Sequence, residues 1–183
     1  TLALWAMSLV VVCAYLLGGH LLTLPTPALG DPKLRRAVSA RRSPSQWLAL
    51  HVLYGDCGCS RRVVRHLARR GPTSLAREHV VIVDPRKGDL EDLREAGFTV
   101  ERTEREALDA EFGVAAAPLL VIADASGAPR YIGGYTDRKR GPSIEDLAVL
   151  RSAQAGDTPE PLPLFGCAVN TTLARQVDPL GLR

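Results

Sequence analysis

The feature that most constrains this chain is a short Cys-Gly-Cys-Ser turn between a predicted buried strand and a predicted amphipathic helix. Residues 47–54 (WLALHVLY) are almost wholly apolar, as expected for a strand covered on both faces. Residues 60–70 place valine and leucine on one face and arginine mostly on the other, which predicts a helix. Cys57 and Cys59 therefore fall at a helix N-terminus, where backbone N–H groups and the helix dipole favour a thiolate.

The residues that follow alternate between predicted strands and predicted helices. Further strands are expected at 79–83, 119–123 and 130–135, and further helices at 89–96, 103–112 and 143–154. Thr103 with Glu106, and Ser143 with Asp146, have the spacing of helix-capping pairs. The last two strands are separated by a turn, which predicts an antiparallel hairpin. This order predicts an α/β fold with a mixed four-stranded sheet.

A proline stands immediately before the strand at 119–123. The bond between Ala117 and Pro118 is of the X–Pro type, for which the cis form is accessible, and a proline there leaves a backbone edge free for an incoming peptide. With the cysteine turn, the stretch FGVAAAPLLVIADASGAPRYIGGYT at 112–136 resembles the thioredoxin superfamily. The resemblance implies a thioredoxin-like three-layer fold over residues 47–155, with substrate binding at Ala117 and Pro118.

The active turn departs from the thioredoxin pattern, because its cysteines are first and third and Ser60 is fourth. Cys57 would be the nucleophile, and either Cys59 or the distant Cys167 would resolve the mixed disulfide. A bond between Cys57 and Cys59 would close a small, strained ring, whereas a bond to Cys167 would pin the C-terminal tail over the site. The CxC turn, Gly133 with Gly134, and Leu-Phe-Gly-Cys167 resemble the membrane-attached RedB-like proteins of bacteria, which implies a periplasmic redox role.

The segments that flank the domain have distinct compositions. Residues 1–24 carry no Asp, Glu, Lys or Arg and are long enough for a membrane span of about 20 apolar residues, which predicts an N-terminal transmembrane anchor; a cleaved signal peptide is the alternative. Residues 25–46 are rich in Pro and Arg and predict a linker without a helix. Residues 156–183 form a Pro-rich tail with Cys167, expected to wrap over the domain or dock on a partner.

The net charge and the motifs of the sequence limit which partners and functions we expect. A net charge of +3 and scattered arginines argue against a nucleic-acid partner, and no cofactor or metal is predicted. We predict a single-pass protein of the inner membrane that exchanges disulfides with protein thiols in the periplasm, although the basic residues after the apolar run alone favour a cytoplasmic domain. Two alternatives stay open: a non-catalytic accessory subunit of a membrane electron-transfer or photosynthetic complex, and a Cu(I) site from Cys57, Cys59 and either His51 or Cys167.

Overall fold

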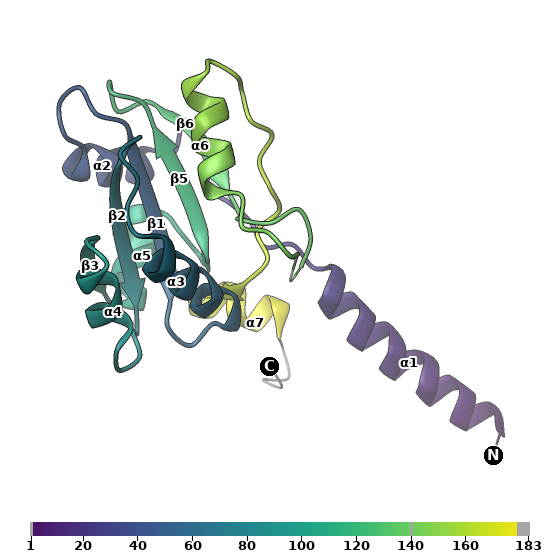
Figure 1. Ribbon diagram of the computed structural model, residues 1–183. Coiled ribbons are helices and arrows are strands. Elements are labelled where there is room, and N and C mark those ends of the chain that lie inside the picture. Colours follow the sequence, from purple (N-terminus) through teal and green to yellow (C-terminus); the bar gives the residue numbers. More distant parts are fainter. Residues whose placement is uncertain (1, 140, 179–183) are drawn as a thin grey trace.

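A mixed five-stranded sheet forms the centre of the computed structural model, which describes residues 2–139 and 141–178, with the backbone alone for residues 15–21 (Figure 1). The strands lie in the order β3-β2-β1-β5-β6. Their bounds are β1 Leu48–Tyr54, β2 Arg77–Val83, β3 Thr99–Thr103, β5 Leu119–Ala123 and β6 Pro129–Gly133. β1 pairs parallel with β2 and antiparallel with β5, and β5 pairs antiparallel with β6. The predicted hairpin and the mixed sheet are thus confirmed.

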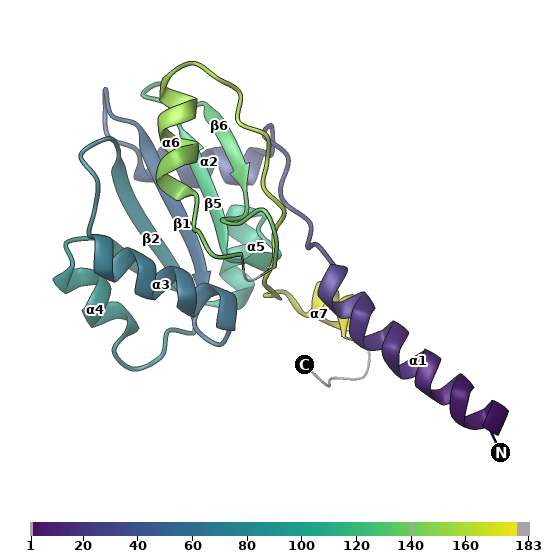
Figure 2. The same cartoon turned by 45° about the vertical axis from the view of Figure 1, so that its right-hand side comes forward.

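Helices cover both faces of the sheet, which gives a three-layer, thioredoxin-like arrangement (Figures 1 and 2). The side chains of β1 alternate between two buried clusters, with Leu50 and Val52 in one and Ala49 and Leu53 in the other. The first cluster is closed by α2 (Pro32–Arg41), α5 (Arg105–Phe112) and α7 (Thr171–Val177). The second is closed by α3 (Gly58–Arg70), α4 (Asp89–Glu95) and α6 (Asp146–Gln154).

The predicted four-strand count is wrong because β3 was not expected. Its residues, Thr-Val-Glu-Arg-Thr, contain one apolar side chain and lie exposed or half-exposed at the sheet edge, so they carry no buried-strand pattern. β3 runs parallel to β2, and Glu101 at its centre forms an ion pair of 2.6 Å with Arg41 of α2. Pairing with β2 and this contact, rather than apolar burial of its own, hold the edge strand in place.

Two predicted helix starts are also corrected. α5 begins after Glu104 and α6 after Glu145, and neither N-cap residue makes a side-chain capping hydrogen bond. The predicted pairs, Thr103 with Glu106 and Ser143 with Asp146, therefore do not cap these helices. Asp146 is instead buried, and its carboxylate faces the C-terminal end of α3.

The segment predicted as a helix-free linker, residues 25–46, contains α2. Asp31 caps this helix by accepting hydrogen bonds from the backbone N–H groups of Lys33 (2.8 Å) and Leu34 (3.1 Å). Pro32 stands at the first helical position, where the missing N–H costs nothing and the fixed φ is suitable. α2 buries Leu34, Ala37 and Val38 against the sheet, so this segment belongs to the packed core.

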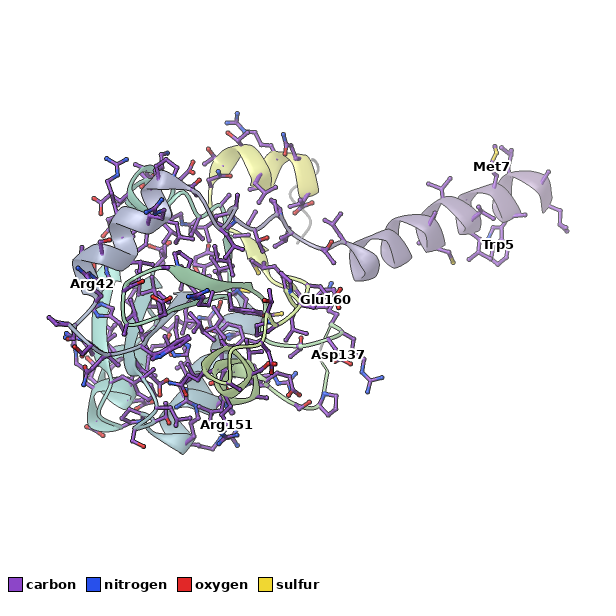
Figure 3. The ribbon with its side chains drawn as sticks, turned by 90° about the horizontal axis from the view of Figure 1, so that it is seen from above. Trp5, Met7, Arg42, Asp137, Arg151 and Glu160 are labelled. Carbon is purple, nitrogen blue, oxygen red and sulfur yellow. The ribbon has the colours of Figure 1, made fainter. Side chains whose placement is uncertain are left out.

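The first 24 residues contain α1 (Leu2–Leu21), which leads away from the domain, with Trp5 and Met7 near its far end (Figure 3). Its described side chains, those up to residue 14, are exposed, and Trp5 keeps 70% of its surface. In the part of the chain that the structure describes, no helix is long and apolar enough to cross a membrane. The predicted transmembrane helix is therefore not found among the described residues.

A short second sheet joins the C-terminal tail to the domain. β4 (Ala116–Ala117) pairs antiparallel with β7 (Cys167–Ala168). Upstream, the buried Leu164 accepts a hydrogen bond of 2.9 Å from the N–H of Leu24, and Leu162 accepts one of 2.8 Å from Gly134. The tail therefore wraps over the domain, which is one of the two arrangements predicted for it.

A buried charge network links four elements at the C-terminal end of α3. Arg70 of α3 donates hydrogen bonds to Glu78 of β2 (2.9 Å) and to Asp146 of α6 (2.8 Å). His51 lies 3.0 Å from Glu78 on its other side. Burial would raise the pKa of Glu78, but hydrogen bonds from His51 and Arg70 hold that pKa at about 2. Burial likewise opposes ionisation of Asp146, yet a hydrogen bond from His66 and the charge of Arg70 keep its pKa at about 2.

Replacing Arg70 tests how much this network contributes to the stability of the fold. Arg70→Ala removes the cation that two buried carboxylates share and leaves them only their histidine partners, so we expect it to lower the free energy of unfolding by roughly 3–5 kcal/mol. Arg69→Ala, an exposed arginine on the same helix, is the matched control and should change it little. Urea unfolding at neutral pH measures both.

The pH dependence of that loss provides a second check. The folded-state pKa values of about 2 lie below the ordinary 4.5 of Glu and 3.8 of Asp, so the stabilisation is complete above those ordinary values. The stabilisation should disappear as the pH falls toward 2. The difference in free energy of unfolding between wild type and Arg70→Ala should therefore become smaller between about pH 4.5 and pH 2. A gap that stayed constant with pH would contradict the network's role.

Candidate functional site

Cys57 occupies the N-cap of α3 and is completely buried. Its N–H donates to the carbonyl oxygen of Tyr54 (3.0 Å), and its own carbonyl oxygen accepts from Arg61 (3.0 Å), which fixes the turn from strand to helix. Its Sγ lies 3.8 Å from the carbonyl oxygen of Ala117. The sequence places this sulfur here because the apolar strand β1 ends at Tyr54 and an amphipathic helix begins at Gly58.

Ser60, at the position of the usual second cysteine, has a structural contact that the sequence did not indicate. It is buried, and its Oγ accepts a hydrogen bond of 3.1 Å from the backbone N–H of Tyr54. The hydroxyl thereby ties the start of α3 to the end of β1. The fourth position of the turn supports the backbone and contributes no thiol.

The second sheet brings Cys167 to this turn. In the β4–β7 pair Ala117 stands opposite Cys167, and Ala116 opposite Ala168. The N–H of Val169 continues the pairing with a hydrogen bond of 2.7 Å to the carbonyl oxygen of Ala115. Two cysteines far apart in the sequence thus come together because the tail adds a strand to the loop before Pro118.

Gly166 makes this close approach possible. A Cβ atom at this position would lie 1.9 Å from the carbonyl oxygen of Ala117 and 2.7 Å from Cδ of Pro118. Only glycine lets the tail backbone pass so near the proline loop. Sequence reasoning did not single out Gly166, although a glycine directly before a cysteine in an otherwise apolar stretch is a signal of close backbone contact.

Hydrogen bonds from two neighbouring thiols favour ionisation of Cys57. Hydrogen bonds from the side chains of Cys167 and Cys59 outweigh burial and, with backbone N–H groups, lower the pKa of Cys57 to about 3. The same hydrogen bond, burial and the charge of Cys57 raise the pKa of Cys167. At neutral pH Cys57 is therefore a thiolate and Cys167 is the protonated donor beside it, which is an arrangement suited to nucleophilic attack by Cys57.

The structure brings all five predicted site residues together. Cys57, Cys59 and Cys167 hydrogen-bond through their sulfurs, and Ala117 and Pro118 lie against them. The predicted cis bond between Ala117 and Pro118 is confirmed. The catalytic and substrate-binding roles of these residues stay predictions.

Two cavities of about 510 Å³ each flank the tail, and Gly166 and Cys167 line both. One cavity lies beside Tyr54, Arg105 and α7. The other lies beside Cys59 and Pro118, and its charged lining residues are Arg62, Arg65 and Lys139. Cys167 is half-buried at the junction of the two cavities, whereas Cys57 lies beneath it and is not exposed.

The predicted copper alternative was tested on the described residues. Among residues 2–139 and 141–178, no three or more His, Cys, Asp or Glu side chains form a group that could hold a metal ion. His51 lies with the cluster on the opposite face of the sheet, where its ring nitrogens are 3.0 Å from Glu78 and 3.0 Å from Tyr135. Neither predicted ligand set, Cys57 and Cys59 with His51 or with Cys167, is therefore found as a metal-holding group among the described residues.

The low pKa of Cys57 makes a prediction about its charge. The ultraviolet absorbance of the Cys57 thiolate is measured as the difference between wild type and Cys57→Ser. This difference should stay constant from about pH 8 down to about pH 5. An ordinary thiol, with a pKa of about 8.5, would already be protonated at pH 5. Cys167→Ala removes the main donor and should move the fall of the absorbance to higher pH. Cys167→Ser keeps a donor and is the control; equal curves for the two variants would contradict the assignment.

Known proteins resemble this chain in fold only. No family model and no curated protein matches it. A solved hypothetical protein from Sinorhizobium meliloti is similar, with a TM-score of 0.51, 16% identity, and coverage of 81% of this chain and 90% of that one. StoA from Bacillus subtilis follows at a TM-score of 0.43, with 13% identity and coverage of 61% and 84%. The thioredoxin domain of a thiol-disulfide oxidoreductase from Bacteroides vulgatus has a TM-score of 0.40, 12% identity and coverage of 61% and 79%. At these identities the likeness concerns the fold alone.

Proposed function

We propose that the protein catalyses thiol–disulfide exchange with protein substrates, and that Cys57 is its nucleophile. The observation that carries the proposal is the pairing of β4 with β7, which sets Cys167 opposite Ala117, the residue whose carbonyl oxygen lies 3.8 Å from the Cys57 sulfur. A buried thiolate is costly unless donors satisfy it, and Cys167 is placed to be such a donor. The pairing thus holds the two cysteines that must bond during resolution at the same site.

The reaction proceeds in two balanced steps. The Cys57 thiolate attacks one sulfur of a substrate disulfide, forms a mixed disulfide, and releases the other substrate sulfur as a thiolate that takes up a proton. Cys167 then gives up its proton and attacks the Cys57 sulfur, which releases the second substrate thiol. The substrate disulfide is reduced to two thiols, and two protein thiols are oxidised to a Cys57–Cys167 disulfide. In reverse, the same disulfide oxidises a substrate dithiol.

Cys59 has a supporting role in this proposal. It also hydrogen-bonds to Cys57 and lowers the pKa of that thiol, while its half-buried side chain lines the basic cavity. Closing a ring between Cys57 and Cys59 would strain the helix start, so Cys167 is the better resolving residue. Cys59 stabilises the thiolate before the reaction.

We further propose that α1 attaches the domain to the periplasmic side of the bacterial inner membrane, in a RedB-like role. Support comes from its described apolar side chains, which include Val10 and Val11 at 66% and 62% exposure and favour contact with lipid. The periplasm is also the compartment in which protein disulfides persist. Protein thiols and disulfides of that compartment are the proposed partners.

The function is tested by turnover. With dithiothreitol as reductant, the full-length protein should accelerate reduction of a disulfide-bonded protein substrate, and Cys57→Ser should reduce this rate to the uncatalysed level. Cys13→Ser, which changes a cysteine in α1, should leave the rate unchanged. Cys167→Ser should keep the first step and accumulate the mixed disulfide, which mass spectrometry detects. Unchanged turnover in Cys57→Ser would disprove the assignment of Cys57 as the nucleophile, whereas no acceleration by the wild-type protein would favour the non-catalytic accessory-subunit alternative.

Membrane attachment has its own test. Val10→Asp combined with Val11→Asp should move the full-length protein from the membrane fraction to the soluble fraction, because two buried charges would oppose contact with lipid. Leu29→Asp, at a position 51% exposed beyond α1, is the control and should stay in the membrane fraction. If the double variant sedimented with membranes as wild type does, α1 would not be the anchor.

A further inference from the structure

We propose that the backbone edge at residues 115–117 binds an extended polypeptide strand with a Gly-Cys sequence, and that the protein's own tail segment, residues 162–170, is the resident occupant which such a strand must displace. This inference rests on the proposed function, since it names the substrate class and the access step of the same site. Its support comes from pairing, register, burial and the anchoring of the tail.

The tail segment is bound as an added β-strand. Cys167 and Ala168 pair with Ala117 and Ala116, and the 2.7 Å hydrogen bond from Val169 to Ala115 extends the pairing. Main-chain pairing at a sheet edge is a general way to bind extended peptides, because it depends little on the side chains of the guest. The same edge can therefore accept a strand from another molecule in this register.

The register places a guest cysteine at the reactive sulfur. The residue opposite Ala117 is Cys167, and its thiol hydrogen-bonds to Cys57. A substrate strand in this position would present its own sulfur to Cys57 in the same way. The tail thus has both properties that a substrate needs here, a backbone that pairs with the edge and a sulfur in contact with the nucleophile.

Burial makes displacement necessary. Cys57 has no exposed surface while the tail segment is in place. A substrate disulfide must bring one sulfur into contact with the Cys57 sulfur, so it cannot react until the tail moves. The docked tail therefore blocks the site, and the reactive form is the one in which residues 166–168 have left the edge.

The two ends of the tail segment are held unequally. On the N-terminal side, Leu164 is buried and bonded to Leu24, and a Cβ at Gly134 would lie 2.1 Å from the carbonyl oxygen of Pro163. On the C-terminal side, Val169 is buried, but α7 has no fully buried residue and only Leu173 and Val177 pack in part against the core. Opening from the α7 side exposes Val169 and breaks these partial contacts, while Leu164 can keep its place.

Glycine before the cysteine gives the site its selectivity. A Cβ on residue 166 would overlap the carbonyl oxygen of Ala117, at 1.9 Å, with backbone atoms on both sides of the contact. A guest strand in the same register meets the same obstacle. Substrates with Gly-Cys should therefore bind, and substrates with a larger residue before the cysteine should be rejected.

The first experiment releases the tail without touching a cysteine. In the full-length protein, Gly166→Ala should raise the rate of Cys57 alkylation by iodoacetamide about tenfold, because it destabilises the closed form. Gly30→Ala adds the same methyl group where no atom lies within 4 Å, and it should react as wild type does. Peptide mapping by mass spectrometry identifies Cys57, and circular dichroism verifies the fold. No acceleration in a folded Gly166→Ala would overturn the proposed occlusion.

The second experiment tests the guest strand. A synthetic peptide with the sequence of residues 162–170, activated as a mixed disulfide with a small thiol, should transfer to Cys57 of Gly166→Ala faster than the same peptide with Ala in place of Gly. Equal transfer from the two peptides would refute the selectivity. If Gly166→Ala fails to fold, the same comparison on full-length Cys167→Ser decides the question.

These readouts separate the two proposals, since neither requires turnover. Acceleration and selective transfer without catalytic reduction would support the strand site and refute the enzymatic function. Turnover by wild type, with no acceleration in Gly166→Ala and equal transfer from both peptides, would support the enzyme and refute the strand site.

Discussion

The pairing of β4 with β7 is the interaction on which the site depends. It is short, two residues on each strand, yet it places the third thiol beside Cys57 and covers that sulfur from solvent. Without it, Cys57 would keep the helix N-terminus and Cys59 but would lose its main hydrogen-bond donor. A net contribution of about 1 kcal/mol per backbone hydrogen bond is enough to hold such a strand and small enough to let it open. The pairing thus sets both the charge and the accessibility of the nucleophile.

The stabilised thiolate also affects the direction of exchange. A thiol of low pKa is a good leaving group and a weaker nucleophile than its high thiolate fraction alone suggests. Stabilising the Cys57 thiolate stabilises the reduced protein, which makes a Cys57–Cys167 disulfide more oxidising. In the proposed cycle, the Cys57–Cys167 disulfide therefore favours oxidation of a substrate dithiol. Net reduction of substrates requires a supply of reductant.

Sequence reasoning succeeded where structure is encoded locally. The apolar runs of β1 and β5, the amphipathic pattern of α3 and the proline before β5 each carry their signal within a few residues. It failed where a contact decides the outcome. β3 has one valine and is held by β2 and by Arg41, and no pattern within its five residues reports either neighbour. In α2 the prolines suggested a break, whereas Asp31 and Pro32 together begin the helix.

The cysteines were found in the sequence, but their arrangement was not. Cys59 and Cys167 were equal candidates to resolve Cys57, because a spacing along the chain says nothing about a tail that folds back. The decisive residue was Gly166, whose missing side chain allows the tail to lie against Ala117 and Pro118. Three-dimensional packing, rather than the motif, is what favours Cys167 over Cys59.

The exposure of the two sulfurs and their strength as leaving groups together determine how a Cys57–Cys167 disulfide would be reduced. A Cys57–Cys167 disulfide would fasten the tail covalently to the edge that a substrate needs, so oxidation would also close the site. Cys57 lies buried, whereas Cys167 lines both flanking cavities, and an incoming thiolate would therefore meet the Cys167 sulfur first. Attack there releases Cys57, whose thiolate is still stabilised by the Cys59 thiol and by the backbone N–H groups at the start of α3, so Cys57 is a good leaving group. The same asymmetry that makes Cys57 the nucleophile in one direction makes Cys167 the point of attack in the other.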